Sequence, residues 1–325
     1  MLTTSRVFAV PESKKRVSLR KLPAILVAVG VLASLSGCSG SPFALGGCTP
    51  AYADGSNAKL VTAHGHFDAD PNAKFPTPLV AKTTEEHVAV AGHGKIVAMG
   101  NTADVRATVY NGKTGASFGS APFLIATSGP ETPGYARLAQ CAAVHSRVSG
   151  VGPAVDLLGA DVARGLSLRD KDTVVVVVDI KDTFLGKANG ADQLAQPGFP
   201  AVVLAPSGQP GLTFPDTPAP TEAKSAVLKQ GSGETIAKGD RVVAHFSSFV
   251  WEQKILGKSS WPSGRPEVFN AVSAAQSPGG LPAPLADALI GQRVGSQIIV
   301  ILPPAATGMP AGSTFVMVID ILGIE

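Results

Sequence analysis

The sequence predicts an α+β fold, in which two similar units each wrap a twisted antiparallel sheet around one short helix. Three observations lead to this prediction. Short apolar, β-branched runs recur between Gly and Pro residues, as buried strands do. Segments about 139 residues apart repeat one another. Of the 325 residues, 16% are charged, too few for a coiled coil, and 45% are hydrophobic, too many for a disordered chain.

The N-terminus has the pattern of an export signal. Basic residues gather between positions 14 and 21, an apolar run spans 22–35, and the segment ends in Leu-Ser-Gly-Cys at Cys38. A basic region, a short apolar region and small residues before a cut are typical of a signal peptide. The ending resembles the lipobox of bacterial lipoproteins, which implies a signal over 1–37, lipidation of Cys38 and a polar tether over 38–57. The alternative is an uncleaved membrane anchor.

The basic charge of the chain belongs to this signal. The whole sequence has a formal charge of +3, and residues 1–37 contain six of its 27 basic residues and one of its 24 acidic residues. Cleavage therefore leaves a formal charge of −2. Because no cluster of Lys and Arg remains, we expect no nucleic-acid partner.

Two cysteines remain after Cys38. We predict that Cys48 and Cys141 form a disulfide, because disulfides persist outside the membrane. Such a bond would tie the N-terminal segment to the first unit. Two buried free thiols are the alternative.

The repeat divides the chain. Residues 71–100 placed over 210–239 give eight identities. Residues 172–180 match 313–321, and 144–148 resemble 294–298. Two copies with this period indicate tandem globular domains rather than a solenoid. We place the domains at 58–190 and 222–325, with a Pro- and Gly-rich linker and lead-in over 191–221.

Each unit has one candidate helix. In the second unit the helix is expected over 285–290, after Pro282 and Pro284 and before Gly291. The segment 135–139 occupies the matching place in the first unit. Strands are expected over 242–250, 297–302 and 314–322.

The second unit resembles the FKBP-type peptidyl-prolyl cis-trans isomerases. The resemblance rests on Gly-Ser-Gly-Glu at 231–234, on Gly-Asp and Val-Ala-His-Phe over 239–246, on Ser-Ser-Trp at 259–261, and on the run 289–296. The first unit resembles the same family more weakly, through 92–94, 109–110, 146–148 and 172–180. A lipobox followed by two such units resembles exported bacterial lipoproteins.

The resemblance implies a slot for a prolyl ring in the second unit. We expect its catalytic wall to contain Phe246, Leu285 and Met317. Substrate contacts are expected from Ile255, Leu256, Phe269, Leu281 and Pro282. The family's floor Trp is Leu285 here, and its last-strand aromatic is Met317. The alternative is that these side chains are ordinary core residues.

The first unit retains little of this pattern. Tyr110 and Phe118 are the only candidates for its aromatic wall, and Val176 stands where an aromatic residue would be. His64, His66, Asp68 and Asp70 alternate and could bind a metal, but a polar loop is the simpler interpretation. We expect no metal and no other cofactor.

The resemblance implies a weak peptidyl-prolyl isomerase or folding chaperone. It would act on prolyl-containing polypeptides as a monomer, lipid-anchored through Cys38 to the outer face of the cell membrane. An apolar, water-excluding slot suits the twisted amide through which an X–Pro bond rotates. The alternative is a binding module that has lost catalysis and binds a Pro-containing or extended partner. A solute-binding lipoprotein is disfavoured, because that class needs long helices.

Overall fold

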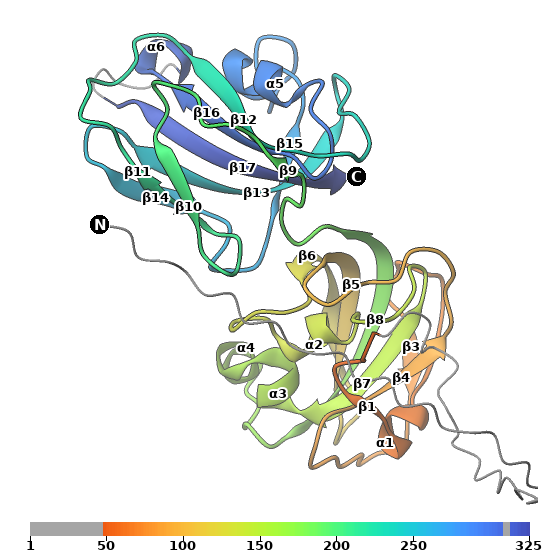
Figure 1. Cartoon of the computed structure of the whole chain (residues 1–325). Helices are drawn as coiled ribbons and strands as arrows, with labels where there is room; N and C mark the ends of the chain where they lie inside the picture. The colour runs from red at the N-terminus through yellow and green to blue at the C-terminus, as the bar shows by residue number, and fades with distance from the viewer. Residues whose placement is uncertain (1–47, 308–312) are drawn as a thin grey trace, which may run out of the picture. The chain divides into compact units, whose positions relative to one another are not determined.

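The computed structural model describes residues 48–307 and 313–325. In this part of the chain, strands form one six-stranded sheet, one seven-stranded sheet and two small two-stranded sheets (Figure 1). The helices are short, so the α+β class expected from the sequence is confirmed. The predicted signal and Cys38 lie outside the described residues. Below, residues 48–190 are called the first half and residues 191–325 the second half.

The first half contains the six-stranded sheet. Its strand order is β1-β4-β7-β8-β5-β6. The strands are β1 (Ala53–Asp54), β4 (Glu85–Val90), β5 (Thr102–Asn111), β6 (Ser117–Ala126), β7 (Arg147–Pro153) and β8 (Thr173–Phe184). The prediction of a purely antiparallel sheet was wrong at one edge, where β1 pairs with β4 in parallel.

The second half repeats this order. Its sheet runs β14-β13-β17-β16-β12-β9, with β15 also pairing with β13. The strands are β9 (Ala191–Asp192), β12 (Lys224–Gln230), β13 (Arg241–Val250), β14 (Ile255–Ser259), β15 (Glu267–Asn270), β16 (Gln297–Leu302) and β17 (Phe315–Ile324). Thus β12, β16, β17 and β13 correspond to β4, β7, β8 and β5, and every pair among them is antiparallel.

The repeat extends into the segment expected to be a linker and lead-in. The hairpin of β10 (Ala201–Leu204) and β11 (Pro210–Thr213) lies 139 residues after the hairpin of β2 (Thr62–His64) and β3 (Asn72–Lys74). The residues that pack against the second sheet from this segment are Phe199, Val202, Leu212, Phe214 and Ala219. Much of 191–221 is therefore ordered structure of the second half.

Both large sheets are covered on both faces, which explains their unbroken apolar runs. In β8, Val174, Val176 and Val178 belong to the core cluster on the helix side, whereas Val175 and Val177 belong to the cluster on the opposite face. All five are at most 1% exposed. A strand covered on one face alternates apolar and polar residues, and a strand covered on both does not.

The helices differ between the halves. The second half has α5 (Ala283–Leu289) against its sheet, with α6 (Pro304–Thr307) after β16. The first half has α1 (Ser56–Lys59), α2 (Gly134–Arg137), α3 (Ala154–Leu158) and α4 (Ala160–Gly165). The expectation of one short helix per unit was therefore wrong for both halves. In the second half the short helix α6 follows β16, and in the first half α3 and α4 occupy the connection between β7 and β8.

Two glycines show how closely the halves repeat. The backbone N–H of Gly92 donates to Ser146 Oγ at 2.9 Å, and that of Gly231 donates to Ser296 Oγ at 2.9 Å. A Cβ on Gly92 would lie 2.2 Å from the Val144 carbonyl oxygen, and one on Gly231 would lie 2.4 Å from that of Val294. Only glycine permits this approach of two backbones.

The N-terminal arm is held against the first half. Cys48 and Cys141 form a disulfide, with their Cα atoms 5.7 Å apart and a sequence separation of 93. The arm then contributes Tyr52 and the short strand β1. The expected polar tether is thus packed structure from Cys48 onward.

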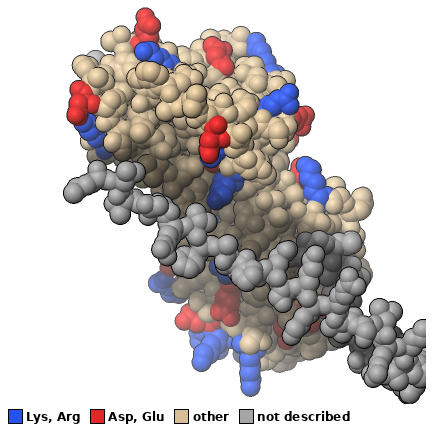
Figure 2. All heavy atoms as spheres, in the orientation of Figure 1, with Lys and Arg blue, Asp and Glu red and all other residues tan. Residues whose placement is uncertain are grey.

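Charged side chains are sparse on the surface. On the face shown in Figure 2, acidic and basic residues lie interspersed on a mostly uncharged surface. Within the described ranges, no helix is long and apolar enough to cross a membrane.

Candidate functional site

The structure brings most of the predicted slot residues together in the second half. Phe246, Phe269 and Leu285 belong to one core cluster, and Leu281 and Met317 pack against it. Pro282 is the N-cap residue of α5, directly before the turn that carries Leu285. Below, the second-half slot means these six residues.

The second-half slot is filled by its own side chains. Phe246, Leu285 and Phe269 are 4%, 3% and 9% exposed. The two phenylalanine rings pack edge to face with centroids 5.6 Å apart. Lys258 Nζ lies 5.5 Å from the Phe246 ring centroid and is paired with Glu267. A prolyl ring could enter only by displacing these groups.

Ile255 and Leu256 do not join this cluster. Both lie in the edge strand β14, 51% and 45% exposed. Leu256 pairs with Phe249, which belongs to the core cluster on the opposite face of the sheet. Because residues directly opposite in a sheet point to the same face, Leu256 points away from the slot.

His245 precedes Phe246 in β13, so its buried side chain lies on the face of the sheet opposite the second-half slot, and it is structural. Its Nδ1 lies 2.8 Å from Ser260 Oγ, and its ring stacks on Trp261 with centroids 4.4 Å apart. Burial lowers the pKa of His245 to about 4. The ring is therefore neutral at physiological pH and packs as an apolar group with one hydrogen bond.

The first half has smaller side chains at two of the corresponding positions. Arg106 lies opposite Asp179, as His245 lies opposite Asp320, so Ala107 takes the place of Phe246. By the same pairing, Ile125 takes the place of Phe269.

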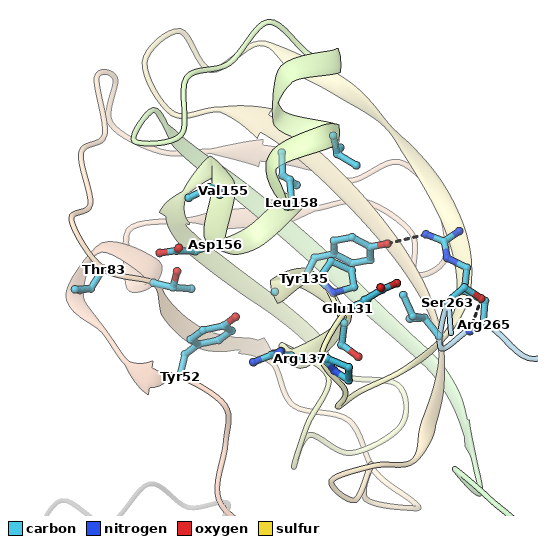
Figure 3. A pocket seen from close by; sticks show the side chains of 18 of the residues that line it. Tyr52, Thr83, Glu131, Tyr135, Arg137, Val155, Asp156, Leu158, Ser263 and Arg265 are labelled. Carbon is cyan, nitrogen blue, oxygen red and sulfur yellow. Dashed lines mark hydrogen bonds between the residues drawn. The ribbon is translucent and has the colours of Figure 1, made fainter. Parts of the chain in front are cut away.

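A cavity opens on the side of the first sheet that α2 and α3 cover. Its volume is about 740 Å³. Its lining comes from Ile125, Tyr135, α3 and α4, and also from Ser263 and Arg265 of the second half. Figure 3 shows this space from close by. Below, the first-half cavity means this space.

One wall of the first-half cavity is apolar. Ile125, Val155, Leu158 and Val162 line it together with the Tyr135 ring. The Tyr135 ring packs on Phe123 with centroids 5.1 Å apart. Burial raises the pKa of the Tyr135 phenol, whose oxygen accepts a hydrogen bond from Arg265 Nη2 at 3.4 Å. This wall offers an apolar surface for an aliphatic or prolyl side chain.

The other wall is polar. Tyr52, Thr83, Arg137 and Asp156 line it (Figure 3), and Thr84, next to Thr83 in the chain, also lines the cavity. Burial raises the pKa of Tyr52.

A buried acid stands next to this polar wall. Glu86, in β4, is 6% exposed, and burial raises its pKa to about 8. Its carboxyl group is therefore mostly protonated at pH 7.

A glycine lets α3 and the N-terminal arm approach α2. A Cβ on Gly134 would lie 2.2 Å from the Asp156 carbonyl oxygen and 2.7 Å from the Tyr52 hydroxyl. The glycine at the start of α2 therefore permits both α3 and the N-terminal arm to pack beside it. The Cys48–Cys141 disulfide fixes the arm that carries Tyr52.

Sequence reasoning missed this cavity. The two residues expected to form an aromatic wall in the first half do not line it. Tyr110 belongs to the cluster on the opposite sheet face, where its hydroxyl donates to the Pro71 carbonyl, and Phe118 is 36% exposed in β6. The available signal was Tyr135, which occupies the place of Leu285 in the repeat.

The alternating His and Asp residues form no metal site. Asp68 Oδ1 accepts from Arg106 Nε at 2.9 Å, and Asp70 lies 3.9 Å from the same guanidinium. No group of His, Cys, Asp and Glu that could hold a metal ion occurs in the part of the chain that the structure describes.

Comparisons with known proteins return structural neighbours only. No protein-family model and no curated protein matches the chain. The three FKBP domains of wheat FKBP73 match with a TM-score of 0.30 at 11% identity, over 74% of this chain and 94% of that one. FkpA from Escherichia coli matches with a TM-score of 0.27 at 20% identity, over 38% of this chain and 51% of that one.

A third structural neighbour is a single domain. The N-terminal domain of FKBP42 from Arabidopsis thaliana matches with a TM-score of 0.28 at 12% identity, over 35% of this chain and 98% of that one. All three neighbours are FKBP-domain proteins, and similarity at this level says nothing about activity.

Proposed function

We propose that this protein is an exported, lipid-anchored polypeptide-binding module of FKBP-like architecture, in which the first-half cavity binds an extended, proline-containing segment. This is the second of the two functions considered from the sequence. Isomerase turnover at the second-half slot is expected to be close to the uncatalysed rate. Export and lipidation of Cys38 rest on the sequence of the signal.

The contrast between the two halves carries this proposal. The second-half slot is closed by Phe246, Phe269 and Leu285, each less than 10% exposed. At the corresponding place the first half has a cavity of about 740 Å³, within the range of ligand sites in proteins. An apolar wall facing a polar wall suits a peptide, which presents apolar side chains and a hydrogen-bonding backbone.

The experiment measures binding and turnover on the same full-length protein. Fluorescence anisotropy with a labelled, proline-containing peptide gives the affinity, and NMR exchange spectroscopy of that peptide gives the isomerisation rate. We expect saturable binding without appreciable acceleration. Rapid isomerisation would support the isomerase function instead.

A variant that fills part of the first-half cavity tests whether the peptide binds there. Val162 lines the first-half cavity and is 51% exposed, so Val162→Trp should fold and fill part of the cavity. The matched control is Val80→Trp, at a residue that is 69% exposed and outside the cavity lining. Val162→Trp should weaken binding at least tenfold and Val80→Trp should not. Equal affinities in both variants would contradict the proposal.

A further inference from the structure

The polar wall of the first-half cavity contains two buried polar atoms without hydrogen-bond partners. These atoms are Thr84 Oγ1 and Arg137 Nε, and no described group bonds to either. Both residues line the cavity. In the adjacent strand, Glu86 Oε2 is a third buried atom of this kind.

An acceptor group can serve as the partner of all three atoms. The Arg137 Nε–H can only donate, and a hydroxyl such as that of Thr84 can donate. Because burial raises the pKa of Glu86 to about 8, its carboxyl group can also donate at pH 7. A buried donor without a partner is costly, most of all on a charged group. A ligand that brings acceptor oxygens would remove this cost.

The charges around the first-half cavity favour a negatively charged ligand. Its lining includes three basic residues, Lys82, Arg137 and Arg265, and two acidic ones, Glu131 and Asp156. The exposed Glu131 and Asp156 offset part of the positive charge. The remaining excess is one positive charge.

The guanidinium of Arg137 has no anionic partner among the described residues. It makes no ion pair with any residue of the described ranges, and its Nη2 donates only to the Gly129 carbonyl, at 3.1 Å. A guanidinium presents a planar fork of donors that matches the two oxygens of a carboxylate. A carboxylate in the cavity therefore complements the unpaired charge of Arg137.

We propose that the polar wall of the first-half cavity, centred on Arg137 and Thr84, binds a carboxylate group carried by the polypeptide ligand. The inference rests on the proposed function and adds the chemical class that the site selects. The carboxylate can come from an acidic side chain or from the C-terminus of the ligand. The apolar wall then holds the neighbouring side chain.

The test compares four forms of one proline-containing peptide by anisotropy on the full-length protein. Three are amidated at the C-terminus and carry Glu, Gln or Lys beside the proline, and the fourth carries Gln with a free carboxylate. We expect the Glu form to bind about tenfold more tightly than the amidated Gln form, which corresponds to about 1.4 kcal/mol. Tight binding of the fourth form identifies a C-terminal carboxylate as the source.

Variants assign the effect to Arg137. Arg137→Gln should remove the preference for Glu over Gln. The control is Arg164→Gln, at an exposed arginine of α4 that is paired with Asp161 and lies outside the cavity lining. If Arg137→Gln does not fold, as judged by its thermal midpoint, Thr84→Val serves as the second variant and should reduce the preference.

The outcomes separate this inference from the proposed function. Failure of all four peptides to bind contradicts both. Equal binding of the amidated Glu form, the amidated Gln form and the Gln form with a free carboxylate contradicts the carboxylate inference only. Tighter binding of the Lys form would show that Glu131 and Asp156 select the ligand instead, and persistence of the Glu preference in Arg137→Gln would also overturn the inference.

Discussion

Replacing Glu86 by Gln should make the protein more stable relative to wild type as the pH rises. The carboxyl group is 6% exposed, and its Oε2 has no hydrogen-bond partner among the described residues. Burial, and secondarily the charge of Asp54, raise its pKa from the ordinary 4.5 to about 8. Gln has the same shape and cannot ionise, so the variant removes the cost of ionisation in the folded state.

The magnitude follows from the two pKa values. A group whose pKa is higher in the folded than in the unfolded chain contributes most stability below the unfolded pKa, and this contribution is lost as the pH rises through the folded pKa. For values of 4.5 and about 8, the loss is about 3 kcal/mol at pH 7 and about 5 kcal/mol at pH 9.

The assay is urea unfolding of wild type and Glu86→Gln at pH 4, 7 and 9. The difference in free energy of unfolding should move in favour of the variant by several kcal/mol between pH 4 and pH 9. The exposed Glu222→Gln serves as the control and should show a difference within about 0.5 kcal/mol at every pH. A constant difference between wild type and Glu86→Gln would refute the reasoning, because Glu86 would then ionise normally in the folded state.

Three further predictions concern other parts of the fold. Replacing both Cys48 and Cys141 by Ala opens a loop of 93 residues and should cost up to about 4–5 kcal/mol in chemical unfolding; an unchanged midpoint would contradict this role. His245, with its pKa lowered from 6.5 to about 4 by burial, should cost wild type up to about 3 kcal/mol of stability as the pH falls from 6.5 to 4. His245→Gln should not show this loss. Equal pH profiles of stability for wild type and His245→Gln would contradict the lowered pKa of His245. Because the second-half slot is full, Leu285→Trp should destabilise the protein by about 1–3 kcal/mol without raising isomerisation; a faster rate would show that the slot accepts a prolyl ring.

Much of the fold follows from local patterns in the sequence. The β-branched runs correctly predicted β13, β16 and β17, and the helix expected after Pro284 is α5. The repeat indicated equivalent strands, and both sheets have the same order through their central strands. These features depend on periodicity and turn residues, which are visible in short windows of sequence.

The hairpin over 201–213 could not be recognised in this way. It was assigned to a linker because Pro and Gly are frequent in 191–221, although its apolar residues cover the second sheet. The frequency of Pro and Gly indicates how many turns a segment contains. It does not show whether the segment packs against a sheet that is distant in the sequence.

The first-half cavity could not be predicted from the sequence either. It depends on which residues replace Phe246 and Phe269 in the repeat, and this requires the strand register. It depends also on α3, α4 and the arm residue Tyr52, all of which come from segments that the sequence did not place next to α2.

The most direct test of the central claim is the location of a bound polypeptide. A proline-containing peptide with a photoreactive group beside the proline would be crosslinked to the full-length protein, and the attachment sites would be read by mass spectrometry. Attachment to α2, to α3 or α4, or to the arm near Tyr52 is the result we expect. Attachment confined to Phe246, Phe269, residues 281–285 and Met317 would contradict the account, because these residues form the second-half slot.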